Sequence, residues 1–338
     1  MDEKSPITAP KIEISSSQKR LSSFRNLFSR LFHVREMAMV VLIFGTCVLM
    51  SLLSPYFLSL TNFVAIARGF SMEGIVVLGM SLLLVSGAFD LSVGSVMAFT
   101  GIVTAWAIVD ANLPYFTAVI LGLAVGGLIG FINGLLVTRV KVNPLIATLG
   151  MMTVVRGMAL GFTEGHPVIN VPLDFAWFGQ GNVAGIPIPF IIMLILAIVT
   201  DVMMRRGRSL RQLYYVGGNI RAARLSGIQV NRVVLLTFIA SGTFAALAGI
   251  ISMARLTSGI PTAFAGVEMR VIAACVIGGM SLSGGEGSVL GALLGLVFMS
   301  LVSNAMTLLG MSIYWEGTVT GSILIAAVAL DMLSHRQL

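Results

Sequence analysis

Apolar stretches of about twenty residues recur along the whole chain and constrain its fold more than any other feature. Each is long enough to cross the roughly 30 Å hydrocarbon core of a membrane as a helix. We place ten of them, near residues 37–57, 67–86, 91–110, 115–137, 143–163, 186–204, 233–253, 267–281, 288–310 and 314–333. The sequence therefore predicts an all-α polytopic membrane protein, with a single membrane domain over residues 37–335.

Composition agrees with this class. Of the 338 residues, 57% are hydrophobic and only 10% are charged, and the mean hydropathy is +0.98. The net charge of +7 is explained by topology, because Lys and Arg gather in segments on one side of the spans and only Arg255 falls in a loop on the other. No nucleic-acid partner is predicted. Cys47 and Cys275 lie inside spans, so neither a disulfide nor a metal site is indicated.

Residues 1–36 form a polar tail that we place in the cytoplasm, without a cleavable signal. Within it, the segment Arg20–Val34 carries apolar residues at helical spacing, which predicts an amphipathic helix. That helix would lie on the anionic cytoplasmic leaflet or pack on the membrane domain itself. Its apolar positions are Leu21, Phe24, Leu27, Phe28, Leu31 and Phe32.

The long polar segment between the sixth and seventh spans is rich in arginine. Seven arginines and no acidic residue occur over Arg205–Arg232, which places this segment, and with it both termini, on the cytoplasmic side. Gly217-Gly218 is expected to break the chain, Asn219 to cap a short helix over Ile220–Ser226, and Gly227 to end it. The small Ala222 and Ala223 would let a partner surface approach closely. The alternative is an ordinary solvated loop whose arginines only set topology.

Two Gly/Ser-rich stretches, Ser86–Val96 and Gly278–Val289, predict broken helices near a transport pathway. Asp90 and Glu286 lie in them, and Asp90 could either cap the helix that follows or face the pathway. Asparagines in the middle of a span more often form hydrogen bonds between helices than contacts with a ligand. The candidate pathway residues are Asp90, Ser92, Asn133, Glu268 and Asn304.

Four segments resemble one family. They are the DLSVGSV run from Asp90 to Val96, the IATLGMMT run at 146–153 followed by Arg156-Gly157, the Gly-rich segment at 277–291, and the central segment with Gly217-Gly218-Asn219 and residues 222–228. Together they resemble the ribose- and arabinose-type permeases, the membrane subunits of bacterial ABC sugar importers, which are grouped with branched-chain amino acid permeases.

This resemblance implies that the short central helix docks in a cleft of a separate ATPase subunit, which would hold ATP–Mg. The chain itself has no P-loop, since none of its four lysines follows a glycine, and no cofactor or catalytic residue is expected in it. The residues expected to carry ATPase coupling are Gly217, Gly218, Asn219, Ala222, Ala223, Arg224, Leu225, Ser226 and Gly227.

The resemblance further implies a second permease copy, a bacterial inner-membrane location and a periplasmic sugar-binding protein. The longest external loop, Pro167–Gly185, and the turn after Arg255 are the expected docking surfaces, with Glu164, Asp174 and Arg255 as candidates. The substrate would be a monosaccharide, most simply a pentose such as ribose or arabinose. The family's acidic pair is only half kept here, because Arg270 accompanies Glu268, so the individual sugar stays open.

Two other functions were weighed. An ion-coupled secondary transporter could use Asp90 or Glu268 as its titratable site, but it would not require the basic central segment. The same architecture could also carry a nucleoside or a branched-chain amino acid. An intramembrane enzyme is not indicated, because the sequence has no HExxH or GxSxG motif.

Overall fold

The computed structural model describes residues 35–335, which are almost entirely helical. The amphipathic helix expected at residues 20–34 lies outside the described residues. The first half of the described chain contains α2 (Arg35–Leu53), α3 (Leu60–Val85), α4 (Val93–Val109), α5 (Tyr115–Leu135), the π-helical turn η1 (Leu136–Val140) and α6 (Pro144–Thr163). The second half contains α7 (Leu173–Gln180), β1 (Asn182–Val183), β2 (Ile186–Pro187), α8 (Ile188–Arg206), α9 (Arg208–Gly218), α10 (Ile220–Leu225), α11 (Val230–Leu256), α12 (Val267–Ile277), α13 (Val289–Leu308), the 3₁₀ turn η2 (Ile313–Trp315) and α14 (Glu316–His335).

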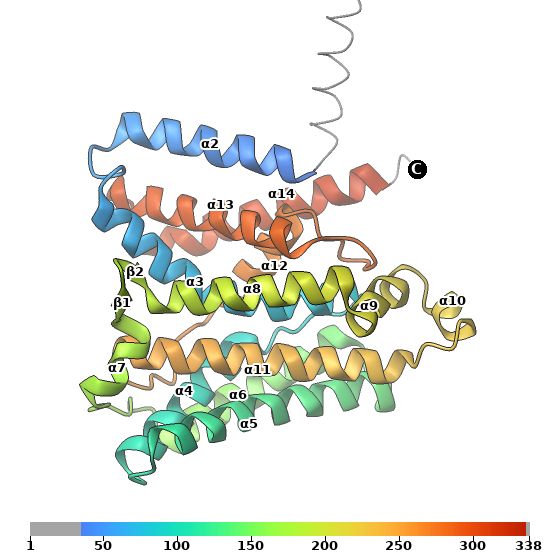
Figure 1. The fold of residues 1–338 in the computed structure, drawn as a ribbon, viewed down its shortest axis with the longest axis horizontal. Coiled ribbons are helices and arrows are strands. Elements are labelled where there is room, and N and C mark those ends of the chain that lie inside the picture. Colours follow the sequence, from blue (N-terminus) through green and yellow to red (C-terminus); the bar gives the residue numbers. More distant parts are fainter. Residues whose placement is uncertain (1–34, 336–338) are drawn as a thin grey trace, which may run out of the picture.

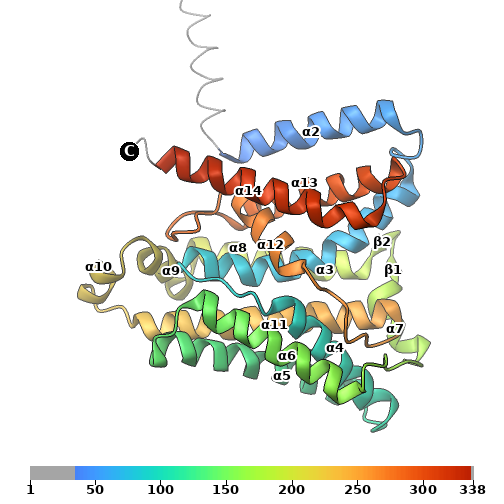
Figure 2. The same ribbon diagram turned by 180° about the vertical axis from the view of Figure 1, so that it is seen from behind.

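The long helices lie side by side along one direction, which gives the bundle two ends (Figure 1). At one end, α10 projects beyond the other helices, and we call this the α10 end. At the other, the α7 end, α7 and the small β1–β2 hairpin cover the helices. The first residues of α2 and the last of α14 both lie at the α10 end, as Figure 2 also shows. The expected arrangement, with both ends of the membrane domain on the side of the central segment, is thus present.

Helices occupy all ten predicted positions, but they are not equally long. Within residues 35–335, seven helices are long and apolar enough to cross a membrane. α4 has 17 residues and α12 only 11, and an 11-residue helix spans about 16 Å, roughly half the hydrocarbon core. The predicted spans near 91–110 and 267–281 therefore contain helices too short to count among these seven.

Two non-helical segments enter the bundle from opposite ends. The first, residues 86–92, runs inward from α3, and its Asp90 and Leu91 are buried. The second, residues 257–266, runs inward from α11, and Arg156 of α6 donates hydrogen bonds to its Pro261 and Ala263 carbonyl oxygens at 2.6 and 2.8 Å. α4 and α12 therefore begin inside the bundle, where a Cβ on Gly94 would lie only 2.5 Å from the Phe264 carbonyl oxygen.

The predicted second break was misplaced. Gly278–Val289 does not interrupt a helix inside the bundle but joins α12 to α13 at the α10 end, where Tyr214 of α9 donates a hydrogen bond to the Gly287 carbonyl oxygen at 3.0 Å. Glu286 is exposed there and not at membrane depth. Gly/Ser-rich composition alone marks both kinds of turn and does not distinguish them.

The charged residues of α3 make long-range contacts. Arg68 and Glu73, five positions apart on this helix, do not pair with each other. Arg68 donates to the Asn182 side chain at 3.1 Å, whereas Glu73 pairs with Arg270 at 3.1 Å. Arg270 also pairs with Glu316 at 3.1 Å. One arginine thus joins α3, α12 and α14, which gives the departure at position 270 a structural role.

Close packing of α5 on α11 forms the centre of the lower layer in Figure 1. A Cβ on Gly130 would lie 2.3 Å from the Phe238 carbonyl oxygen, and one on Gly242 would lie 2.3 Å from that of Gly126. Small residues let helix backbones approach this closely and so increase their van der Waals contact. In a membrane this contact drives helix association, and the hydrophobic effect does not, because lipid tails are as apolar as side chains.

We predict that Gly130→Ala will lower stability by about 1–3 kcal/mol, because its methyl group must push α11 away from α5. Thermal unfolding of the detergent-purified protein measures the effect. Gly150→Ala is the matched control, since a Cβ there meets nothing within 4 Å. An equal loss in both variants would contradict close α5–α11 packing.

Candidate functional site

The arginine-rich segment folds into a helical hairpin, α9 followed by α10, that leaves the end of the bundle (Figure 1). Contrary to expectation, Gly217-Gly218 does not break the chain, because α9 continues through Gly218. The change of direction occurs at Asn219, whose backbone is extended with φ −156° and ψ 100°. The chain therefore changes direction at Asn219 alone, and neither glycine ends α9.

The predicted caps of α10 are confirmed. The Asn219 side chain accepts a hydrogen bond from the Ala222 backbone N–H at 3.0 Å. At the other end, Gly227 adopts φ +80°, and the N–H groups of Gly227 and Ile228 donate to the Arg224 and Ala223 carbonyl oxygens. This is the Schellman arrangement, which needs a left-handed residue and so favours glycine. A six-residue helix is thereby held at both ends.

The two alanines of α10 face different ways, and only one matches the expectation. Ala222 is exposed, but Ala223 is 3% exposed and packs in the chain's own core with Val216, Val230 and Phe238. Ala223 therefore fastens α10 to the bundle and is not available to a partner. The outward apolar residue is Leu225, which is 91% exposed.

Three glycine-containing segments meet where the hairpin joins the bundle, and we call this contact the glycine junction. Its members are Gly87 after α3, Gly217 in α9 and Gly284-Gly285 between α12 and α13. A Cβ on Gly217 would lie 2.0 Å from the Val85 carbonyl oxygen and 2.4 Å from the Gly285 nitrogen. The Gly285 N–H donates to the Val85 carbonyl oxygen at 2.9 Å. Backbone thus rests on backbone, without intervening side chains.

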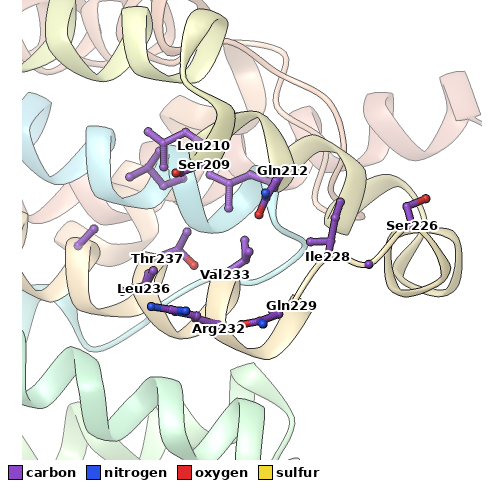
Figure 3. Close-up of a pocket in the computed structure, with 14 residues that line it drawn as sticks. Ser209, Leu210, Gln212, Ser226, Ile228, Gln229, Arg232, Val233, Leu236 and Thr237 are labelled. Atoms are coloured by element: carbon purple, nitrogen blue, oxygen red, sulfur yellow. The ribbon is translucent and has the colours of Figure 1, made fainter.

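A cavity of about 560 Å³ separates α9 from the first turns of α11. In Figure 3, Leu210 and Gln212 of α9 point toward Val233 and Thr237 of α11 across this space. The hairpin is therefore packed tightly at the glycine junction and at Ala223 but loosely against this face of α11. Such an arrangement gives α9 and α10 room to shift around fixed contacts.

The buried polar candidates form a network at the start of α4. Asp90 accepts hydrogen bonds from the Ser92 N–H at 2.8 Å and the Ser92 hydroxyl at 2.5 Å. Asn133 of α5 donates to the Ser92 hydroxyl at 3.0 Å. Asp90 therefore closes the turn before α4. It is not the N-cap, because α4 begins at Val93 with Ser92 as its N-cap residue. All three are at most 1% exposed, so no route for a solute reaches them in this conformation.

The other two pathway candidates lie apart from this network. Asn304 of α13 exchanges side-chain hydrogen bonds with Asn62 of α3 at 2.7 and 3.2 Å, which is the interhelical role expected of such residues. Glu268 accepts a hydrogen bond from the Gly266 N–H at 3.1 Å, in the first turn of α12. A Cβ on Gly94 would lie 2.6 Å from a Glu268 carboxylate oxygen, so Glu268 faces the start of α4.

Comparison with known proteins identifies the class of this fold. A family described as branched-chain amino acid transport system, permease component, matches residues 62–328. The chain belongs to this permease family.

Three curated members are similar over nearly their whole length. The ribose import permease of Escherichia coli K12 is 38% identical over 314 residues, covering 91% of this chain and 97% of that protein. The D-allose and L-arabinose transport system permeases of the same strain are 35% and 36% identical, each covering 96% of this chain and 98% of the relative. The comparison with solved structures finds no significant match.

In this permease, the segments that carried the resemblance converge in space. The segment at 277–291 contributes Gly284-Gly285 to the glycine junction, the central segment contributes Gly217, and Gly87 leads into the Asp90–Val96 run. Sequence reasoning missed this convergence. The available signal was a glycine in each of three distant segments, but nothing in one sequence says which of these segments touch.

The docking candidates at the α7 end differ in accessibility. Glu164, at the left-handed end of α6, and Asp174, in the first turn of α7, are exposed. Arg255 is not in a loop, because it lies in the last turn of α11, is only partly exposed and contacts the Met72 sulfur at 3.6 Å. Its position favours packing of α11 on α3 over contact with another protein.

We predict that Gly217→Ala will destabilise the permease by about 1–3 kcal/mol, because its methyl group cannot fit among three backbones. It should also reduce transport more than Gly218→Ala, the adjacent residue in the same helix. A Cβ on Gly218 meets nothing within 4 Å. Thermal unfolding and uptake by both variants check this. If the two behave alike, the glycine junction carries neither stability nor function.

Proposed function

We propose that this permease is the membrane subunit of an ABC importer for a neutral monosaccharide. The observation that carries the proposal is the projecting α10, held at both ends by caps and presenting Leu225. An exposed leucine beside Arg221 and Arg224 on a short rigid helix suits insertion into a cleft of another protein. An ion-coupled carrier has no need of such an element.

In this proposal, the α10 end faces the cytoplasm of a bacterial cell and the membrane is the inner membrane. The seven arginines of Arg205–Arg232 support that orientation, since arginine is enriched in cytoplasmic loops. Both termini are then cytoplasmic. A separate ATPase subunit would hold ATP–Mg and bind α10, and two permease copies would enclose one pathway.

Motion of the ATPase would reach the bundle through the glycine junction. α9 rests there on the end of α3 and on the segment between α12 and α13. Each of these leads directly to a short helix that begins or ends within the bundle, namely α4 and α12. A shift of the hairpin would therefore bear on the start of α4 and on the end of α12, in keeping with rigid-body rocking between two accessible states.

At the α7 end, a periplasmic sugar-binding protein would dock on the exposed surface of Pro167–Gly185. Glu164 and Asp174 remain the charged candidates there, together with Trp177 and Phe178, which are 54% and 45% exposed. The substrate is proposed to be a pentose such as ribose or arabinose, because the similar ribose and arabinose permeases cover almost the whole chain.

We predict that Leu225→Glu will weaken ATPase binding about 30-fold or more, as expected when a buried interface anchor is replaced by a charge. Ser209→Glu is the control, because it places the same carboxylate on the exposed first turn of α9, away from α10. Co-purification of the ATPase with each variant is the measurement. Retention of the ATPase by Leu225→Glu would remove α10 from the interface.

Uptake of labelled pentoses, hexoses, nucleosides and branched-chain amino acids, with the cognate binding protein and ATPase present, tests the substrate. We expect pentose uptake that depends on ATP. Uptake of an amino acid would contradict the sugar assignment and leave the ABC assignment intact. Sugar uptake on an ion gradient without any ATPase would contradict the ABC assignment itself.

A further inference from the structure

A second cavity, of about 600 Å³, lies where α10, η1 and the first turns of α11 meet. Four cationic side chains line it, and they come from different elements. Arg139 belongs to η1 and Lys141 follows it, Arg224 belongs to α10, and Arg232 belongs to α11. Segments separated by up to ninety-three positions in sequence thus place their positive charges around one space.

No negative side chain in the described part of the chain balances these charges. The lining of the cavity contains no Asp or Glu, and among residues 35–335 none of the four cations forms an ion pair with a carboxylate. The Lys141 ammonium group donates to the Asn231 side chain at 3.1 Å. Four like charges around a single concavity repel one another unless an anion lies between them.

The ends of two apolar helices mark this cavity as lying where lipid headgroups are expected. The span over Tyr115–Val140 ends at the cavity, and the span over Val230–Leu256 begins there. Both spans therefore lie on the same side of the cavity. Val140 and Ile146, which flank the cationic residues in sequence, are 64% and 65% exposed. Leu235 completes the lining one turn further into α11. A ligand with a charged head and an apolar tail could contact the cations with its head and these apolar side chains with its tail.

We propose that this cavity binds the phosphate headgroup of an anionic phospholipid. The guanidinium groups of Arg139, Arg224 and Arg232 can each donate two hydrogen bonds to phosphate oxygens, and Lys141 adds a point charge. The acyl chains would lie along the exposed apolar residues of the neighbouring spans. The bound lipid would tie α10 to the ends of α5 and α11, so that lipid composition would affect how firmly the hairpin is held.

Native mass spectrometry of the purified full chain in a neutral detergent tests this with dioleoyl phosphatidylglycerol as the probe. Dioleoyl phosphatidylcholine has the same acyl chains without net charge, and inorganic phosphate has the charge without the chains. We expect phosphatidylglycerol to bind most tightly. The Arg139→Gln/Lys141→Gln variant should weaken its binding about 30-fold, from the loss of two surface cations.

Arg206→Gln/Arg208→Gln removes the same charge from exposed positions at the α10 end that do not line this cavity, and it should leave binding unchanged. Equal weakening by both variants would show general surface attraction and overturn the proposal. Displacement of phosphatidylglycerol by inorganic phosphate at equal concentration would also overturn it, because the acyl chains would then contribute nothing. So would loss of ATPase binding with lipid binding retained in Arg139→Gln/Lys141→Gln. The lipid measurement needs no transport, so its outcome is independent of the proposed function.

Discussion

The requirement that every backbone polar group be satisfied inside a membrane governs this structure. Two non-helical segments, residues 86–92 and 257–266, run into the bundle. In each, side chains bind backbone groups that no helix satisfies. The Asp90 carboxylate accepts the Ser92 backbone N–H in the first, and Arg156 donates to two carbonyl groups of the second. Arg156 lies within the span of α6, so a charged residue in a span is explained by the backbone groups that it binds.

Sequence patterns predicted the local features well. Apolar length located helices at all ten positions, and the residue types at Asn219 and Gly227 gave the caps of α10, because caps depend on neighbours in the chain. Contacts between distant segments were harder. Glu73 pairs not with the nearby Arg68 but with Arg270, 197 positions away, since a buried charge pairs with whichever opposite charge the fold brings close.

The candidate site shows the same difference between local features and contacts of distant segments. The α10 helix follows from sequence, but the direction of each side chain depends on how α9 packs. Ala222 and Ala223 are identical in type and adjacent, yet only Ala223 enters the core. The glycines at 217 and 218 were likewise interpreted as helix breakers, whereas close backbone contact is what requires glycine at 217.

The helices that begin inside the bundle have an electrical consequence. A helix N-terminus carries a partial positive charge of about half an elementary charge. The N-termini of α4 and α12 both lie in the interior of the bundle. Each also brings a carboxylate, from Asp90 just before α4 and from Glu268 in the first turn of α12. When both carboxylates are ionised, they offset the positive helix ends from within the chain. Each of these two helices thus brings to the interior a group of the sign that its own N-terminus favours.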